Sequence, residues 1–284
     1  MHSPLTPFGT RLRAAMDARG QLCVGIDPHA SLLAAWALSD DAAGLDRFAQ
    51  TCVEAFGDQV SVVKPQSAFF ERHGSAGIAV LERTVAGFRA AGALVLLDVK
   101  RGDIGSTMQG YADAYLDQSS PLAVDAITLS PFLGFGSLRP AIDVAAAHGA
   151  GVFVLARTSN PEAPSVQQAV RGGDSVAARI LADITAANAA AGVSGLGSIG
   201  AVVGANLSQV EEDLAIGGPL LAPGYGAQGG GPDDLARNFA GVLDSVLPSS
   251  SRRVLAAGPD APKLRDAARR TSDEIGSALS TVVH

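Results

Sequence analysis

Short runs of β-branched and leucine side chains alternate along the chain with longer alanine-rich stretches whose apolar residues recur at helical spacing. Such alternation is typical of repeated strand–helix units, in which the strands are buried on both faces and therefore read as continuous apolar runs. Strands are predicted at residues 22–27, 60–64, 94–98, 126–129, 151–156, 199–203, 220–222 and around 244–251. Helices are predicted at residues 45–56, 77–91, 107–116, 138–148, 175–191, 207–214, 233–239 and 261–276.

About eight strand–helix units in roughly 250 residues are expected for a (β/α)8 TIM barrel. A doubly wound sheet is the alternative. Polar residues favour the barrel, because they fall at or just after the carboxyl ends of strands, which converge on one mouth. These residues are Asp27, Lys64, Asp98, Thr128, Ser159, Asn206, Gly224 and Arg252. No long linker or repeat divides the chain, so we expect an α/β fold with a single TIM-barrel catalytic domain over residues 1–284. Its core would span about 20–258 and its last helix 261–276, with the longest loop excursion at 159–174.

Composition narrows the classes of function. Hydrophobic residues make up 47% of the chain and charged residues 17%, so a large core can be buried. The formal net charge is −7 and the basic residues are scattered, which disfavours nucleic-acid binding. No apolar run approaches the roughly 20 residues of a membrane span, and the N-terminus lacks a signal-peptide pattern. With no disulfide or zinc spacing at Cys23 and Cys52, we expect a cytoplasmic protein with no membrane partner.

The densest chemical signal is the segment that follows the predicted third strand. Asp98 and Lys100 stand two residues apart, so on an extended segment both side chains point to the same face. Inside a barrel mouth, two opposite charges would be costly to bury unless they are paired, and their presence after an apolar strand suggests a functional role. The alternative interpretation is a solvated turn with an incidental ion pair.

Two neighbouring strands also end on charged residues. Lys64 and Asp27 are each followed by proline, which ends the strand in an extended conformation and leaves the charged side chain at the rim. Each residue alone is commonly just solvated. Together with Asp98 and Lys100, they place two lysines and at least two carboxylates on neighbouring strands of one mouth.

The late segment 222–231 is rich in glycine, including Gly224, and precedes a predicted helix that opens at Pro232. Glycines let backbone N–H groups approach an anion closely, and a helix N-terminus adds a favourable dipole. This pattern predicts a phosphate site in a late barrel loop, and a merely flexible surface loop is the alternative. The histidines show no spacing for a metal site or a catalytic triad.

These motifs together resemble the orotidine 5'-phosphate decarboxylase family, in particular its longer bacterial branch that is common in actinobacteria. The resemblance runs from about residue 27 to 252 and is carried by the Asp98-x-Lys100-x-x-Asp103 motif with Thr107 beyond it. It is also carried by the Pro-Gly-x-Gly-x-Gln-Gly-Gly loop at 223–230. The first motif also marks related barrels, whereas its combination with the second is specific.

The resemblance implies roles for the charged residues. Lys100 would protonate C6 of the pyrimidine as carbon dioxide leaves, and Asp98 would sit beside the departing carboxylate and hold Lys100. Lys64 would contact the ribose and complete an alternating Lys-Asp-Lys-Asp array. The last member, Asp103, would reach in from a second subunit with Thr107 near it, which implies an obligate homodimer with shared active sites.

It also implies the remaining contacts to the substrate, orotidine 5'-phosphate. Asp27 would bind a ribose hydroxyl, and Ser159 would hydrogen-bond the pyrimidine edge. Gln228 would donate to the phosphate from a closing loop, and Arg252 would clamp it. Because Arg253 follows directly, the sequence leaves open which of the two arginines is the clamp.

Elementary chemistry agrees with these roles. Loss of carbon dioxide from a vinylic carbon leaves a localised anion, so the site must supply a fixed cation, and an ammonium can also deliver the proton. No metal or organic cofactor is therefore expected. Two alternatives are a Mg²⁺-dependent sugar-phosphate barrel enzyme on the same scaffold and a catalytically silent nucleotide-binding dimer. A metal site would prefer a carboxylate at position 64, where this chain has lysine.

Overall fold

The computed structural model describes residues 5–226 and 229–280 and contains a closed barrel of eight parallel strands. Closure is shown by β1, which pairs with β2 on one side and β10 on the other, so the doubly wound alternative is wrong. Around the barrel the order is β1-β10-β9-β8-β5-β4-β3-β2. The strands are β1 (Cys23–Ile26), β2 (Val62–Pro65), β3 (Leu94–Arg101), β4 (Ala126–Leu129), β5 (Gly151–Arg157), β8 (Ile199–Val203), β9 (Leu220–Pro223) and β10 (Val246–Ser250).

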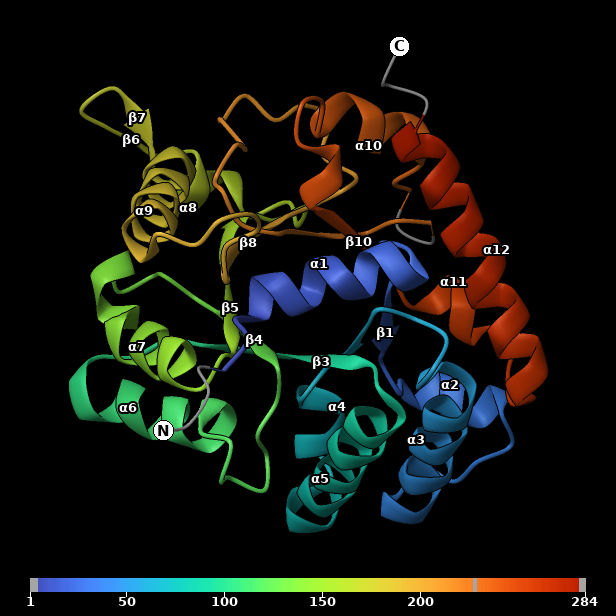
Figure 1. Cartoon of the computed structure of the whole chain (residues 1–284). Coiled ribbons are helices and arrows are strands. Elements are labelled where there is room, and N and C mark those ends of the chain that lie inside the picture. The colour runs from blue at the N-terminus through green and yellow to red at the C-terminus, as the bar shows by residue number, and fades with distance from the viewer. Residues whose placement is uncertain (1–4, 227–228, 281–284) are drawn as a thin grey trace.

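Helices surround the strands (Figure 1). The α-helices are α1 (Phe8–Arg19), α2 (Ala30–Ala35), α3 (Ala42–Phe56), α4 (Ala68–Glu71), α5 (Gly74–Ala91), α6 (Gly105–Leu116), α7 (Arg139–Ala147), α8 (Pro164–Gln167), α9 (Val176–Ala191), α10 (Pro232–Asn238), α11 (Arg252–Leu255) and α12 (Ala261–Ser280). Two 3-10 turns, η1 (Phe135–Leu138) and η2 (Leu243–Ser245), and a small hairpin of β6 (Val170–Arg171) and β7 (Asp174–Ser175) complete the fold. No helix within the described ranges is long and apolar enough to span a bilayer.

The core forms two layers. The larger lies between the strands and the surrounding helices, where side chains such as Phe48, Phe56 and Phe88 are fully buried. The smaller fills the barrel interior with one buried side chain from each strand, such as Cys23, Val62 and Phe153. Burial on both faces explains why the strands read as continuous apolar runs in the sequence.

Helix α1 was not among the predicted elements. Its buried residues Phe8, Leu12 and Met16 follow each other at four-residue spacing and pack onto the smaller core layer, where the rings of Phe8 and Phe153 meet edge to face. Figure 1 shows α1 lying across the barrel, and its contacts with the barrel interior place it over the amino ends of the strands. That end of the barrel is therefore covered.

The predicted helix at 207–214 is wrong, because that stretch has no helical residues. Glu212 explains the difference, since its side chain is buried and paired with Arg157 at the end of β5. Three consecutive acidic residues, 211–213, would also stand in the last turn of such a helix, where the helix dipole disfavours negative charge. In contrast, the last predicted helix is longer than expected and extends to Ser280.

Candidate active site

Lys64, Asp98 and Lys100 meet at the carboxyl ends of β2 and β3, as the sequence predicted. The Nζ atom of Lys64 donates to Asp98 Oδ2 over 2.8 Å, and the Nζ atom of Lys100 donates to Asp98 Oδ1 over 2.6 Å. The side chains of Lys64 and Asp98 are 7% and 9% exposed, whereas that of Lys100 is 46% exposed. One carboxylate therefore holds two ammonium groups, one buried and one open to the mouth.

The backbone at Lys100 differs from a plain extended strand. Lys100 has a φ of 46°, in the left-handed region, and the pairing of β3 with β4 shifts register between Leu97 and Arg101. A lysine in that region is strained, and such strain is typical of functional sites. Thr128, on β4, compensates by accepting from the Lys100 backbone N–H over 2.9 Å and donating to Asp98 Oδ1 over 2.8 Å. Simple alternation along an extended strand therefore predicted the meeting of Asp98 and Lys100 but not its geometry.

Burial disfavours the charged forms of Lys64 and Asp98, but the attraction between their opposite charges is stronger and keeps both ionised. For Lys64, burial alone lowers the pKa, but the carboxylates of Asp98 and Asp27 more than reverse this and hold its pKa above the ordinary 10.5. For Asp98, burial alone raises the pKa, but the ammonium groups of Lys64 and Lys100 hold its pKa well below the ordinary 3.8. Both members of the pair are therefore charged at neutral pH.

Asp98 and Lys100 line a cavity of about 200 Å³, which we call the base-side cavity after the part of the ligand that the family resemblance implies there. Ser159, predicted at the end of the fifth strand, also lines it. Its remaining wall comes from the ends of β4, β5, β8 and β9. The lining residues beyond these three are Thr128, Leu155, Arg157, Thr158, Asn160, Val202, Gly204, Leu221 and Pro223.

A second cavity of about 260 Å³, the phosphate-side cavity, shares Asp98 and Pro223 with the first. Besides Asp98, four predicted residues line it, namely Asp27, Lys64, Gly224 and Arg252. Asp27 Oδ1 and Ser251 Oγ are buried without a hydrogen-bond partner among the residues that the structure describes. Buried polar atoms are normally paired, so these oxygens are suited to a polar ligand.

The two adjacent arginines take different directions. Arg252 lines the phosphate-side cavity, whereas Arg253 pairs with Glu274 on α12, whose Oε1 also accepts from the Tyr225 hydroxyl over 2.8 Å. Tyr225 belongs to the glycine-rich loop, so Glu274 fastens that loop to α12. The geometry therefore favours Arg252 over Arg253 as the phosphate clamp.

The glycine-rich loop depends on glycine at specific positions. Gly224 and Gly226 have φ values of 97° and 84°, and a Cβ on Gly226 would lie 2.9 Å from Arg253 Cδ. The loop leads into α10, where the Gly231 backbone N–H donates to Asp234 Oδ2 over 2.9 Å. Gln228 lies outside the described residues, so its predicted contact with the phosphate stays a prediction.

Asp103 and Thr107 do not join the cavities of their own chain. Asp103 Oδ1 accepts from the Ile104 backbone N–H over 2.8 Å, and in the described part of the chain Asp103 forms no ion pair. Thr107 is exposed in the first turn of α6. The predicted contribution of Asp103 and Thr107 to the site of a second subunit stays a prediction.

Several lining residues were missed by the sequence analysis as candidate ligands. Thr128 was noted only as a strand-end residue, although it bridges Asp98 and the Lys100 backbone. Gln66 follows Lys64-Pro65, and its Nε2 donates to the Asp98 carbonyl over 3.2 Å. His29 lies on the phosphate-side cavity against the Phe69 ring. Their position just past strand ends was the available signal.

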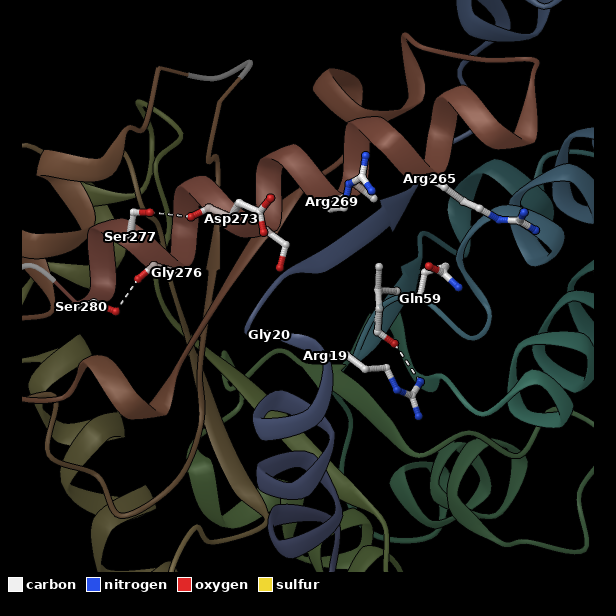
Figure 2. Close-up of a pocket in the computed structure, with 12 residues that line it drawn as sticks. Arg19, Gly20, Gln59, Arg265, Arg269, Asp273, Gly276, Ser277 and Ser280 are labelled. Atoms are coloured by element: carbon white, nitrogen blue, oxygen red, sulfur yellow. Dashed lines mark hydrogen bonds between the residues drawn. The ribbon is translucent and has the colours of Figure 1, made fainter.

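A larger cavity of about 700 Å³ lies away from the mouth and contains none of the predicted residues. It borders Gly20 and Val60, which precede β1 and β2, and runs along α12 (Figure 2). Two of its arginines are engaged with backbone carbonyls, Arg19 with Val60 and Arg265 with Glu54. Within the described ranges, no group of three or more His, Cys, Asp or Glu side chains is arranged to hold a metal ion.

A closed parallel barrel whose mouth joins a buried lysine–aspartate network to a glycine-rich loop has the architecture of a barrel enzyme with its site at the carboxyl ends of the strands. A sequence model described as "Orotidine 5'-phosphate decarboxylase / HUMPS family" matches residues 20–267. The chain belongs to this family.

Individual relatives match nearly the whole chain. The orotidine 5'-phosphate decarboxylase of Streptomyces coelicolor is 61% identical over 278 residues, covering 97% of this chain and 99% of that protein. That of Nocardioides sp. is 62% identical over 277 residues, covering 96% and 100%. A crystal structure from Streptomyces avermitilis has a TM-score of 0.94 and 60% identity, covering 98% of each chain. The resemblance to the actinobacterial branch is thereby confirmed.

Proposed function

We propose that this chain decarboxylates orotidine 5'-phosphate to UMP and carbon dioxide in de novo pyrimidine biosynthesis, as one catalytic domain. The observation that carries the proposal is the ammonium of Lys100, held 2.6 Å from Asp98 on the wall of the base-side cavity. Directly beside it lies the phosphate-side cavity with Arg252 and the glycine-rich loop. The names of the close relatives support the same activity.

The two adjoining cavities suggest how the substrate lies. The pyrimidine ring enters the base-side cavity, where Ser159 meets its polar edge and Lys100 faces C6. The ribose spans the shared wall, with its hydroxyls toward Asp27 and Lys64. The phosphate reaches Arg252 and the backbone at Gly224. The unpartnered oxygen of Asp27 supports a hydroxyl donor at that point.

The reaction needs a cation at one carbon. When the bond between C6 and the carboxylate carbon breaks, its electron pair stays on C6 and carbon dioxide leaves. The Lys100 ammonium stabilises that charge and transfers its proton to C6, which completes UMP and leaves a neutral amine for reprotonation from water. Asp98 holds the ammonium in position, and Lys64 keeps Asp98 ionised.

A Mg²⁺-dependent reaction on the same scaffold is the weaker candidate. Both oxygens of Asp98 already accept hydrogen bonds from lysine ammonium groups, so a divalent cation would meet like charge at that carboxylate. The catalytically silent alternative is also weaker, because Lys64, Asp98, Lys100 and Asp103 are all present.

The proposal includes a homodimer with shared active sites. Ile104, Phe132 and Leu133 are large apolar side chains that are 62%, 79% and 52% exposed. They lie on the loops after β3 and β4, and Ile104 directly follows Asp103. Exposed apolar side chains grouped beside a functional site are typical of an interface. A cytoplasmic location is part of the same proposal, because both cysteines are buried free thiols.

One assay tests the activity. Purified protein is given orotidine 5'-phosphate without added metal, and the ultraviolet change is compared with UMP and carbon dioxide released. Equal amounts of both products are expected; no conversion would contradict the proposal.

A second experiment tests the sharing of sites. Lys100→Ala and Asp103→Ala proteins, each nearly inactive alone, are mixed after mild dissociation. If Asp103 serves the partner's site, the hybrid dimer has one intact site and up to about a quarter to a half of wild-type activity returns. If the mixture is shown to contain hybrid dimers but no activity returns, the proposal that Asp103 serves the partner's active site is contradicted.

A further inference from the structure

A second buried ion pair lies beside the base-side cavity and takes no part in the chemistry described above. Arg157, the last residue of β5, lines that cavity, and its Nη1 donates to Glu212 Oε1 over 2.6 Å. The two side chains are 10% and 6% exposed. Two opposite charges are costly to bury, and such pairs are known to fix a single arrangement in some proteins.

The same carboxylate oxygen has a second donor. Ser175 Oγ lies 3.4 Å from Glu212 Oε1, while also capping α9 by accepting from the Ala178 backbone N–H over 3.0 Å. Arg157 directly precedes the loop 158–174, and Ser175 directly follows it. Glu212 therefore joins the two ends of this loop through one oxygen atom.

The loop whose two ends Glu212 joins contributes part of the wall of the base-side cavity. Thr158, Ser159 and Asn160 all line the base-side cavity. Inside the loop, the Thr158 backbone N–H donates to Gln167 Oε1 and Gln167 Nε2 donates to Thr158 Oγ1, each over 2.8 Å. The segment around Ser159 is thus fixed at both ends of the loop and once within it.

We propose that Glu212 is a positioning residue for the pyrimidine end of the substrate. It acts through Arg157 and Ser175, which hold the loop 158–174 so that Ser159 faces the ring. Glu212 is not among the residues that line either cavity at the mouth, so its effect is indirect. Fixing the loop ends removes alternative loop conformations before the ligand arrives, which favours binding of the base. The inference rests on the proposed function.

The test separates the two ends of the ligand. Glu212→Gln keeps the shape of the side chain but removes its charge, so Arg157 loses its neutralising partner. We expect the Kd for UMP to rise about tenfold, and kcat/KM for orotidine 5'-phosphate to fall by a similar factor. The Kd for ribose 5-phosphate, which occupies only the phosphate-side cavity, should stay within about twofold of wild type.

Two further variants complete the experiment. Asp143→Asn removes the charge from the exposed Arg139–Asp143 pair on α7 and should change neither Kd. Gln167→Ala removes two hydrogen bonds within the same loop and leaves the ion pair intact. It should raise the Kd for UMP and leave the Kd for ribose 5-phosphate unchanged. If Glu212→Gln does not fold, as judged by circular dichroism, Glu212→Asp, which keeps the charge but shortens the side chain, is measured in its place with the same two ligands.

The outcomes are distinct. A wild-type protein that fails to convert orotidine 5'-phosphate would contradict the proposed function itself. If the wild type is active but the variants bind UMP and ribose 5-phosphate with equally raised Kd values, the positioning role of Glu212 is overturned and the proposed function stands. The same conclusion follows if neither Kd changes.

Discussion

The two ends of the mouth differ in how complete they are. At the base end, Asp98 already receives hydrogen bonds from Lys64, Lys100 and Thr128. At the phosphate end, Asp27 Oδ1 and Ser251 Oγ are buried without a partner in the described part of the chain. Folding alone therefore assembles the groups proposed to do the chemistry, whereas these two oxygens beside the proposed ribose and phosphate positions are left for the ligand to satisfy.

This difference matches two separate tasks. Charge stabilisation is effective only when dipoles and ions are already oriented before the reaction, because reorientation during the reaction would cost energy. Binding energy from a remote anion can instead be used to complete the site as the substrate arrives. Changes to Lys64, Asp98 or Lys100 should therefore act mainly on kcat, and changes at the phosphate end mainly on KM.

The largest effect is expected from Lys100→Ala. Removal of the proposed acid should lower kcat by about ten-thousandfold, because both the electrostatic and the proton-transfer contributions are lost. Binding of UMP should survive in part, since the phosphate-side cavity is unchanged. Steady-state kinetics and calorimetry measure the two effects. Lys263→Ala, on the exposed surface of α12, is the matched control, and full activity in Lys100→Ala would contradict the assignment.

Asp98→Asn should have the next largest effect, and it should act on both activity and stability. It leaves Lys64 charged and buried without its carboxylate, which costs about 3–5 kcal/mol of unfolding free energy, and kcat should fall at least about a hundredfold. Urea unfolding and kinetics at pH 7 measure both. Unchanged stability would show that the Lys64–Asp98 pair is not needed to keep the base end assembled.

The stability loss should also depend on pH. The pKa of Asp98 lies below its ordinary 3.8, so its contribution is present above about pH 4 and is lost as pH falls through the lowered value. The pKa of Lys64 lies above 10.5, so its contribution is present below that pH and is lost as pH rises through the raised value. The gap between wild type and Asp98→Asn should therefore be constant near neutrality and narrow in acid. A gap that stays constant down to pH 2 would argue against the charge of Asp98 as its source.

At the other end of the mouth, Arg252→Ala should raise KM by roughly ten- to hundredfold with a smaller effect on kcat, because a charge-assisted contact to the phosphate is lost. Arg253→Ala is the adjacent control and should change KM by no more than about threefold, since its guanidinium faces Glu274. If Arg253→Ala raises KM more than Arg252→Ala does, Arg253 is the residue that binds the phosphate.

The smallest effect is expected from chelation. Dialysis against EDTA should leave kcat and KM unchanged, because the proposed step relies on Lys100 and the carboxylate of Asp98 is paired with lysines. Loss of activity that Mg²⁺ restores would favour the sugar-phosphate alternative.

Much of the barrel could be predicted from the sequence because its strands are buried on both faces. Strand ends such as Lys64 and Leu129 were placed within a residue or so of their positions, since an apolar run stops where the chain reaches the mouth. Helix α1 was missed altogether, because its apolar stripe is narrow and consists mainly of Phe8, Leu12 and Met16. The helix expected at 207–214 failed because a contact 55 residues away, between Arg157 and Glu212, overrides local preference.

The candidate site was predictable as a set of residues and not as a geometry. Charged residues at strand ends carry a local signal, so Asp27, Lys64 and Lys100 could be named. The bridging by Thr128 and the left-handed backbone of Lys100 depend on the pairing of β3 with β4, which no local pattern records. Arg252 and Arg253 are alike in sequence, and only the position of Glu274 on α12 separates them.

The positive φ of Lys100 has a consequence for how the protein can change. A residue with a Cβ in that conformation carries a backbone penalty of about 1 kcal/mol or more, which glycine would largely avoid. In Lys100→Gly, relief of this backbone penalty would be set against loss of the ion pair with Asp98, so the change in stability should be smaller than the ion pair alone would give, whereas turnover would be lost. Thermal unfolding and kinetics of Lys100→Gly compared with Lys100→Ala would separate the two contributions.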